Sequence, residues 1–417
     1  MMVDSISTLL GSIILFIFSF IAHRMVKDIL SPAVIFPLVW AIALFFLSLI
    51  TPLLGFYHIN SWVLLIFVGG ALLFSIVSIL VSTCFGFNKP LKFSLTLEQI
   101  NYKRILIIFY IGTILSSPFV ISAAMSYGDN IVQIASRIRY ERIHGDGDIA
   151  PKTVQNWFTF AFFLIFILIS GVVKHKVKVK YIILPIAVNL LLYLLLEGRS
   201  AIIMQIFAWM FLIIMITGGV KISHLVTIVF SILCFIILGS VFVAKVDTNN
   251  ITLIDQGMVY LRHILSYLYQ GPVLFSEYFD GKINIRENWD ALNNFLHILN
   301  NLGITNAEIS QHADFAMFGY DAEDYGNVYS IYFSIYPHYG YIGLLFFLAL
   351  YAIIATIFFK FSKLGGVFCL YVSGTLFSSS LLSVFMDGYG YLIYFFIKSF
   401  VFFIFVKLTC TNKYSLG

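Results

Sequence analysis

The sequence contains very little charge. Only 11% of its 417 residues are Asp, Glu, Lys or Arg, and 60% are hydrophobic. A soluble domain usually carries about 25% charged residues, because its surface must face water. The composition therefore excludes an ordinary soluble domain and indicates that much of the protein surface faces lipid.

Cysteine is also scarce, and basic residues are thinly spread. The net charge of +5 comes from Lys and Arg scattered between hydrophobic runs, so it does not form the basic patch that binds nucleic acid. The cysteines fit neither a disulfide framework nor a metal site. They are Cys84, Cys234, Cys369 and Cys410. We therefore expect no metal, no cofactor and no nucleic-acid partner.

Long hydrophobic runs are abundant instead. A helix needs about 20 apolar residues to cross the hydrocarbon core of a bilayer. The sequence therefore predicts an all-α polytopic membrane protein with about eleven transmembrane helices. The expected spans are 5–22, 29–50, 61–83, 104–126, 154–173, 181–197, 201–217, 223–245, 338–359, 365–386 and 391–407.

The distribution of basic residues predicts the orientation, since cytoplasmic loops are enriched in Lys and Arg. With the N-terminus outside and the C-terminus in the cytoplasm, the cytoplasmic segments carry 15 basic and 2 acidic residues, and the outer segments carry 9 basic and 18 acidic residues. The opposite orientation would place the KHKVKVK run at 174–180 outside. The pattern therefore favours the first orientation.

Two of the expected outer loops are longer than turns. Residues 1–245 would hold helices 1–8 and an Arg-bearing outer loop at 127–153, residues 246–337 one large outer loop, and residues 338–417 helices 9–11 and a short cytoplasmic tail. A structureless loop of about 90 residues would be unusual. Gly257–Gln270 and Asn288–Asn301 each repeat apolar residues at helical spacing. We therefore expect a partly helical loop with amphipathic helices on the membrane surface.

The few basic residues expected outside are candidates for binding phosphate. Arginine carries a permanent charge and a planar fork of donors that suits phosphate or pyrophosphate. The alternatives are a solvated loop touching lipid headgroups, or an anchor that fixes a hairpin near the membrane. The candidates are Arg137, Arg139 and Arg142 in the first loop, Arg199 in the short turn after residue 197, and Arg262 in the large loop.

Acidic residues and a histidine gather where the large loop meets the ninth expected span. Asp321, Glu323 and His338 could each act as a general base. Acidic residues also flank membrane helices simply because water begins there, and this alternative stays open for each of them.

The order of these parts resembles the Wzy-type O-antigen and oligosaccharide repeat-unit polymerases. The resemblance rests on the Arg-bearing loop near residue 140, the tight hairpin Gly198–Ser200, and a long outer loop that ends in Asn327–Tyr329 and Tyr336–Gly343. Some members carry an arginine followed eleven positions later by glycine. Here Ala150 follows Arg139 and Val273 follows Arg262 at that distance, so this motif is absent.

The resemblance implies glycosyl transfer at the outer face of a bacterial cytoplasmic (inner) membrane. Such enzymes move a growing glycan from undecaprenyl pyrophosphate onto a sugar hydroxyl of the next lipid-linked repeat unit. The arginines named above would stabilise the pyrophosphate leaving group, and His338, Asp321 or Glu323 would deprotonate or orient the acceptor hydroxyl. The implied partners are the lipid-linked oligosaccharide, membrane lipid, and a chain-length regulator and a flippase of the same pathway.

Two other functions remain open. An O-antigen ligase would use the same chemistry, but the related ligases carry a histidine eleven residues before the glycine equivalent to Gly340, where this sequence has Tyr329. A lipid-linked oligosaccharide transporter or flippase would be expected to have short loops and an internal repeat. The long loop and the lack of a visible repeat favour the polymerase.

Overall fold

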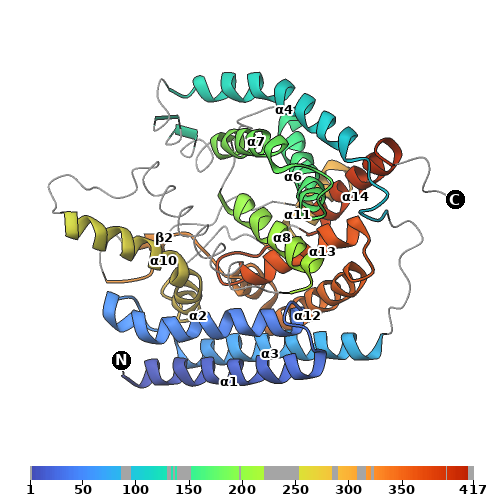
Figure 1. Ribbon diagram of the computed structural model, residues 1–417. Helices are drawn as coiled ribbons and strands as arrows, with labels where there is room; N and C mark the ends of the chain where they lie inside the picture. The colour runs from blue at the N-terminus through green and yellow to red at the C-terminus, as the bar shows by residue number, and fades with distance from the viewer. Residues whose placement is uncertain are drawn as a thin grey trace. The chain divides into compact units, whose positions relative to one another are not determined.

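The computed structural model describes residues 2–85, 95–128, 133–134, 137–138, 152–196, 199–219, 253–283, 290–307, 316–320, 324–390 and 392–411. Most of them are helical (Figure 1). The helices are α1 (Met2–Val26), α2 (Pro32–Leu54), α3 (Ser61–Cys84), α4 (Tyr102–Met125), α6 (Lys152–Val173), α7 (Ile183–Leu196), α8 (Arg199–Thr217), α10 (Leu253–Phe279), α11 (Asn293–Asn301), α12 (Ile331–Ser362), α13 (Val367–Leu381) and α14 (Leu392–Thr409). Strands β1 (Ala316–Met317) and β2 (Tyr325–Gly326) pair antiparallel.

Six of the described helices are long and apolar enough to cross a membrane. These segments are Ser5–Val26, Pro32–Leu54, Ser61–Cys84, Tyr102–Met125, Thr153–Val173 and Ile331–Ser362, and three shorter apolar helices are Ile183–Leu194, Ala201–Thr217 and Val367–Leu381. The described part of the chain is therefore mainly helical, and its long apolar helices suggest a membrane-embedded protein. The expected span 223–245 lies outside the described residues, so the number eleven stays a prediction.

Helix α1 shows why these helices require lipid. It exposes large apolar side chains along one face, including Leu10, Ile17 and Phe20, which are 56–57% accessible. Water would make such a face costly, because roughly 25 cal/mol is lost for each Å² of apolar surface left in it. In a bilayer the same face needs no protein partner.

By its internal contacts the chain forms two compact units. The first unit comprises Met1–Asn88, Leu261–Lys360 and Leu376–Phe395, and the second comprises Lys89–Tyr260, Phe361–Thr375 and Phe396–Gly417.

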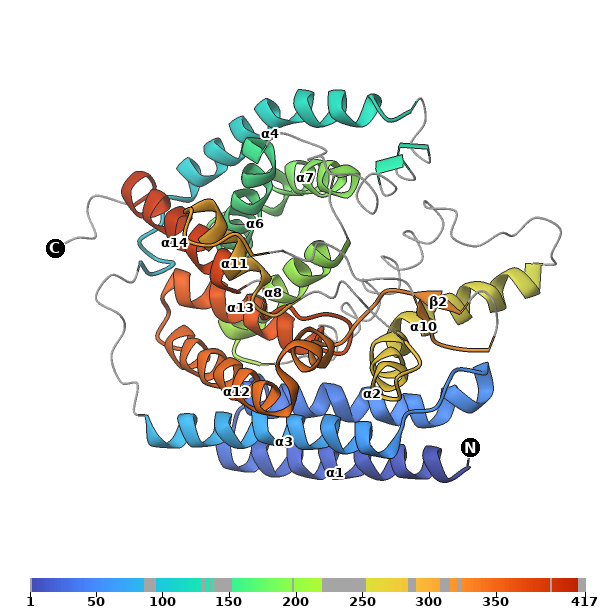
Figure 2. The same ribbon diagram turned by 180° about the vertical axis from the view of Figure 1, so that it is seen from behind.

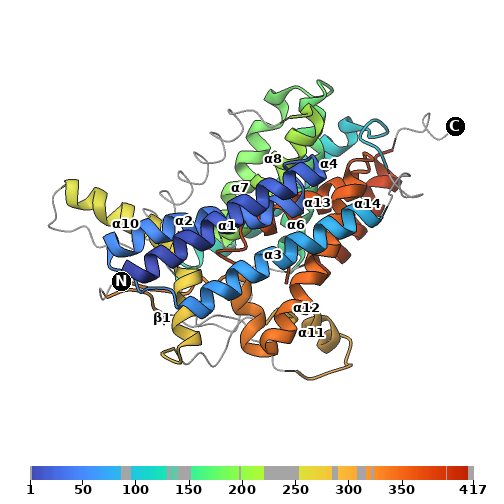
Figure 3. The ribbon, with the colours of Figure 1, turned by 90° about the horizontal axis from the view of Figure 1, so that it is seen from below.

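In the first unit, α1, α2 and α3 lie side by side (Figures 1 and 3). Small polar residues let these helices approach closely and bond to neighbouring backbone, as is common between helices in membranes. The Ser12 hydroxyl donates to the Ala41 carbonyl at 2.8 Å, and the Ser19 hydroxyl donates to the Val34 carbonyl at 3.1 Å. The three helices therefore form a bundle held by packing and by hydrogen bonds.

An aromatic core joins this bundle to α12. The Trp40 ring lies 4.9 Å from Phe67 and 4.8 Å from Tyr332, measured between ring centroids. The Tyr332 hydroxyl donates to the Phe67 carbonyl at 2.9 Å, and the Trp40 indole donates to the Ser383 hydroxyl at 3.0 Å. Gly70 faces Tyr332 closely, because a Cβ there would lie 2.6 Å from its ring.

Helix α12 is interrupted at Gly340, whose backbone has φ 59° and ψ −159°. This conformation is essentially restricted to glycine. Figure 3 shows α12 (orange) changing direction along its length. The break separates a first arm, Ile331–Tyr339, from the longer apolar arm that follows.

The second unit contains α4, α6, α7 and α8, and Figures 1 and 2 both show α4 beside α6 and α7. Buried polar bonds link these helices. The Asn189 side chain donates to the Thr113 hydroxyl at 2.5 Å, and the Tyr102 hydroxyl lies 3.3 Å from that of Ser170. A Cβ on Gly112 would collide with Trp157, so glycine is what allows α4 and α6 to meet there.

Candidate functional site

The polar stripe of α10 faces inward within the first unit. Arg262, Ser266 and Gln270 follow one another at intervals of four residues, so all three share a face of the helix. Ser266 is 4% exposed and Gln270 is 4% exposed. The sequence left open whether this stripe points inward or into water, and the structure places it inward. This part of α10 is therefore packed in the fold and does not rest on a surface.

Arg262 forms an ion pair with Asp324. Its Nε lies 3.2 Å from Oδ1 and its Nη2 lies 2.7 Å from Oδ2 of the carboxylate. The Asp324 side chain is 3% exposed, whereas 28% of the arginine side chain remains accessible. A two-pronged contact of this kind fixes the direction of the guanidinium plane. The arginine is thus held in a defined orientation with part of its surface open.

The ring of Phe56 lies beneath this arginine. The guanidinium carbon is 5.6 Å from the ring centroid, a distance at which a cation is attracted to an aromatic face. Phe318 packs edge-on against Phe56, with ring centroids 5.3 Å apart. Arg262 of the ion pair therefore packs against an apolar, aromatic surface.

Two glycines permit the close approach of the chain segments around the ion pair. A Cβ on Gly319 would collide with the Asp324 carboxylate, and a Cβ on Gly326 would collide with the Gln270 amide. The Gln270 oxygen in turn accepts a hydrogen bond from the Val328 amide at 3.3 Å. Residues 324–328 are thereby held against α10.

A second polar group surrounds the start of α12. The Tyr339 hydroxyl lies 2.8 Å and 2.9 Å from the two Asp290 carboxylate oxygens, and it donates its one hydrogen to this carboxylate. The Ser334 hydroxyl donates to Asp387 at 2.7 Å. The first arm of α12 is thus tied to residue 290 and to the turn after α13.

Asp387 is buried in that turn. Its Oδ1 accepts from the amides of Tyr389 and Gly390 at 2.9 Å and 3.0 Å. Burial raises the pKa of Asp387 to about 6, although the hydrogen bonds from Ser334 and from these amides oppose the shift, and the negative charge of Asp290 adds to it. The carboxyl group therefore changes its protonation close to neutral pH.

The residues predicted for the site are distributed over both units. Arg262 belongs to the first unit, as does His338, which is exposed and lies two residues before Gly340. Arg137 is exposed in the second unit, next to Ile138, which packs against Ala124. Arg199 begins α8, and its side chain is not described. Arg139, Arg142, Asp321 and Glu323 lie outside the described residues.

Sequence reasoning did not select Asp324, Asp290 or Tyr339. Asp324 directly follows the acidic residues at 321 and 323, and the flanking glycines 319 and 326 were the signal that chain segments approach closely here. Asp290 gave no such signal, because its partner Tyr339 is 49 residues away. Within the described ranges no three His, Cys, Asp or Glu side chains gather to hold a metal ion.

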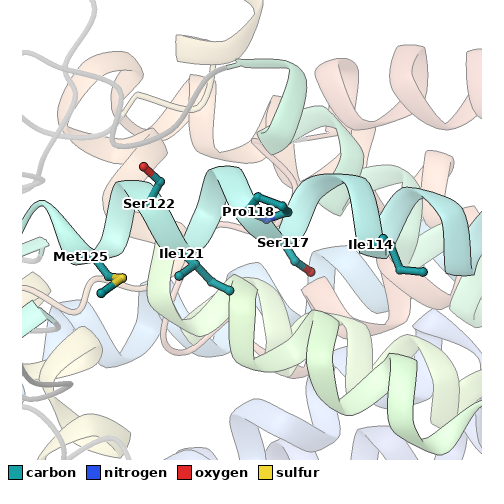
Figure 4. A pocket seen from close by; sticks show the side chains of 6 residues that line it. All are labelled: Ile114, Ser117, Pro118, Ile121, Ser122 and Met125. Atoms are coloured by element: carbon teal, nitrogen blue, oxygen red, sulfur yellow. The ribbon is translucent and has the colours of Figure 1, made fainter.

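A shallow hollow lies along α4 in the second unit (Figure 4). Its volume is about 700 Å³. The described side chains that line it are apolar or carry a hydroxyl group. The residues that line it are Ile114, Ser117, Pro118, Ile121, Ser122 and Met125.

Comparison with known proteins adds no relative to this description. The chain matches no protein-family model, no curated protein and no solved structure.

Proposed function

We propose that this protein polymerises oligosaccharide repeat units carried on undecaprenyl pyrophosphate, at the outer face of a bacterial cytoplasmic membrane. The observation that carries the proposal is the Arg262–Asp324 pair. It consists of a partly exposed arginine side chain whose guanidinium is oriented by a buried carboxylate, in the segment that joins two groups of apolar helices. The distribution of Lys and Arg favours an outer position for this segment.

The reaction would be a glycosyl transfer. The acceptor hydroxyl oxygen forms a bond to the anomeric carbon of the donor glycan, the bond from that carbon to the pyrophosphate oxygen breaks, and the electron pair leaves with the pyrophosphate. A preorganised guanidinium stabilises that departing negative charge, because its donors need no reorientation during the reaction. Arg262 suits this role, and Arg137, Arg139, Arg142 and Arg199 are further candidates from the sequence.

The acceptor proton needs a base. His338 is exposed, so substrate can reach it, and an imidazole nitrogen can accept the proton of the acceptor hydroxyl. Asp321 and Glu323 remain alternatives from the sequence. We assign the proton to His338 first because it adjoins the Gly340 break, which places it at the end of a helix arm where a substrate can approach.

The decisive experiment compares the banding of surface polysaccharide from a deletion strain complemented with wild type, Arg262→Ala, Arg262→Lys or Arg24→Ala. Arg24 is an exposed arginine on α1 of the same unit and serves as the matched control. We expect Arg262→Ala to collapse the ladder to a single capped repeat unit at normal protein level. Arg262→Lys should restore it poorly, since lysine keeps the charge but loses the planar fork.

The other possible functions give different patterns. Long chains that accumulate on the lipid carrier, without transfer to the final acceptor, would indicate a ligase. Lipid-linked repeat units trapped on the cytoplasmic side would indicate a flippase. A ladder that is unchanged in the deletion strain would refute the proposal.

A further inference from the structure

Two tyrosines form a pair beside the Arg262–Asp324 site. Tyr57 lies in the connection between α2 and α3, and Tyr320 lies in the connection between β1 and β2. Their rings meet edge to face, with centroids 4.8 Å apart and an interplanar angle of 86°. Tyr320 is 67% exposed. The pair thus presents an aromatic surface to the surroundings of the protein.

The backbone holds this pair in place independently of the side chains. Phe56 and Gly319 form an antiparallel bridge. On either side of it the Tyr57 amide donates to the Phe318 carbonyl at 3.0 Å, and the Tyr320 amide donates to the Gly55 carbonyl at 3.2 Å. The tyrosines are therefore preorganised, and removing the Tyr320 ring would leave its main-chain bond intact.

Two groups of paired charges involve residues near the tyrosines. Asp324, the partner of Arg262, lies against Gly319, the residue before Tyr320. The Lys282 ammonium lies 2.8 Å from the Glu277 carboxylate and 3.5 Å from that of Asp280. Burial raises the pKa of the Tyr57 hydroxyl, and the charges of Glu277 and Asp324 raise it further.

Two further hydrogen bonds join the connection between α2 and α3 to the C-terminal end of α10. The Asn60 amide group donates to the Asp280 carboxylate at 2.6 Å, and the Asn60 main-chain amide donates to the Ser276 hydroxyl at 2.8 Å. Among the described residues near the tyrosines, Arg262 pairs with Asp324, and Lys282 pairs with Glu277 and Asp280. These pairs offer hydrogen-bonding groups of both signs.

We propose that Tyr57 and Tyr320, with Lys282 and Asp280 at their rim, form a binding subsite for an uncharged sugar ring. A sugar presents an apolar face of C–H groups, which packs on an aromatic ring, and a rim of hydroxyls, which exchange hydrogen bonds with charged side chains. An aromatic surface bordered by internally paired charges matches both features. A tyrosine that only anchors the protein at a lipid interface needs no such charged rim.

This inference rests on the proposed function where it names the sugar as part of the acceptor repeat unit. The subsite borders Arg262, so an acceptor held on Tyr320 would lie next to the guanidinium that is proposed to receive the leaving pyrophosphate. Sugar binding can nevertheless be measured without any assumption about the reaction.

The experiment is saturation-transfer NMR on the purified chain, in a detergent without a sugar headgroup, because a maltoside would compete. The probes are the methyl glycosides of glucose, galactose, rhamnose and N-acetylglucosamine. We expect saturation transfer from wild type and from Tyr320→Phe to at least one probe, and no transfer from Tyr320→Ala. Tyr181→Ala is the matched control, since Tyr181 is 46% exposed and belongs to the second unit.

The outcomes separate the subsite from the reaction. The subsite would be overturned if wild type transferred saturation to none of the probes, or if Tyr320→Ala transferred as much as wild type. The same variants are then tested for the polysaccharide ladder. Loss of probe binding together with shortened chains supports both proposals. If Tyr320→Ala loses probe binding but deletion of the gene leaves the ladder unchanged, the result supports the subsite and refutes the polymerase.

Discussion

The Asp324 carboxylate receives both prongs of the Arg262 guanidinium although the two residues are 62 positions apart in the chain. The contact joins α10 to the segment that follows β1, and it lies over the ring of Phe56. The contact therefore has two roles. It holds the chain near Asp324 against α10, and it fixes the Arg262 guanidinium in one orientation.

The first prediction concerns the stability of this pair. Arg262→Met removes both hydrogen bonds of the guanidinium to the buried Asp324 carboxylate, and we expect it to lower the free energy of unfolding by about 2 kcal/mol, less than for a fully buried pair because the arginine is partly exposed. Arg262→Met combined with Asp324→Asn should recover much of this loss. Thermal unfolding in detergent measures it. A double variant whose loss equals the sum of the single losses would contradict the coupling.

The second prediction is a pH dependence. Burial raises the pKa of Asp387 from 3.8 to about 6 in the folded protein, so the folded state binds this proton more tightly than the unfolded state does. The contribution of Asp387 to stability is therefore most favourable below pH 3.8, and it declines by about 3 kcal/mol as the pH rises to 6.

Asp387→Asn is the test. The amide cannot ionise, so unfolding measured between pH 4 and pH 7 should lose this component, and the variant should be at least as stable as wild type at neutral pH. A variant that retains the full wild-type slope would show that other groups cause the pH dependence.

The third prediction concerns the interruption of α12. Gly340 has a backbone conformation that side chains rarely adopt, and no atom lies within 4 Å of a Cβ built there. Gly340→Ala should therefore destabilise the protein by about 1–3 kcal/mol through backbone strain alone. Gly69→Ala is the control, because Gly69 is helical with equally open space, and alanine there should be neutral or stabilising by up to about 1 kcal/mol. Equal effects at the two positions would argue against strain at Gly340.

The fourth prediction separates catalysis from folding at His338. The side chain is exposed, so His338→Ala should leave the unfolding temperature within a few degrees of wild type, since surface changes usually cost less than about 0.5 kcal/mol. The proposed base is lost, and general-base catalysis typically contributes about 100-fold or more in rate. We therefore expect slower polymerisation and a shorter polysaccharide ladder. His297→Ala, at an exposed histidine on α11, should leave the ladder intact. If both variants polymerise normally, His338 is not the base.

The fifth prediction concerns the orientation in the membrane. A single cysteine at Tyr320 should react with a membrane-impermeant maleimide added to intact spheroplasts, and a cysteine at Lys176 should react only after the membrane is opened. All four native cysteines, Cys84, Cys234, Cys369 and Cys410, are first replaced by alanine. Labelling of position 176 but not 320 from outside would reverse the proposed orientation.

Composition predicted the fold class because the shortage of charge leaves few other solutions. Each of the six long apolar helices overlaps an expected span, since about 20 apolar residues produce the same signal whatever surrounds them. The last of them begins at Ile331, however, inside the stretch 246–337 that was expected to be loop. The helix in the large loop was predicted over Gly257–Gln270, whereas α10 extends to Phe279. The amphipathic pattern ends at Gly271 and Pro272, because the residues that follow are buried on every side of the helix. The sequence pattern therefore did not predict that the helix continues.

The candidate site was less predictable. Arg262 could be identified from its charge alone, because a basic residue in an acidic outer segment is unusual. Its partner Asp324 could not be separated from its acidic neighbours at 321 and 323, since only the fold decides which carboxylate is buried. Tyr339 and Asp290 meet through packing between distant segments, and no local pattern encodes such a contact.

The glycine that interrupts α12 has a mechanical consequence. The arm before it, which carries His338 and Tyr339, is fastened by Ser334 to the turn at Asp387, while the arm after it is apolar and continues to Ser362. The first arm is also held by Tyr332 in the aromatic core and by Tyr339 at Asp290. The backbone of one residue therefore sets the angle at which the end that carries the proposed base leaves the apolar arm, and a residue that straightened the helix there would move that end away from these partners.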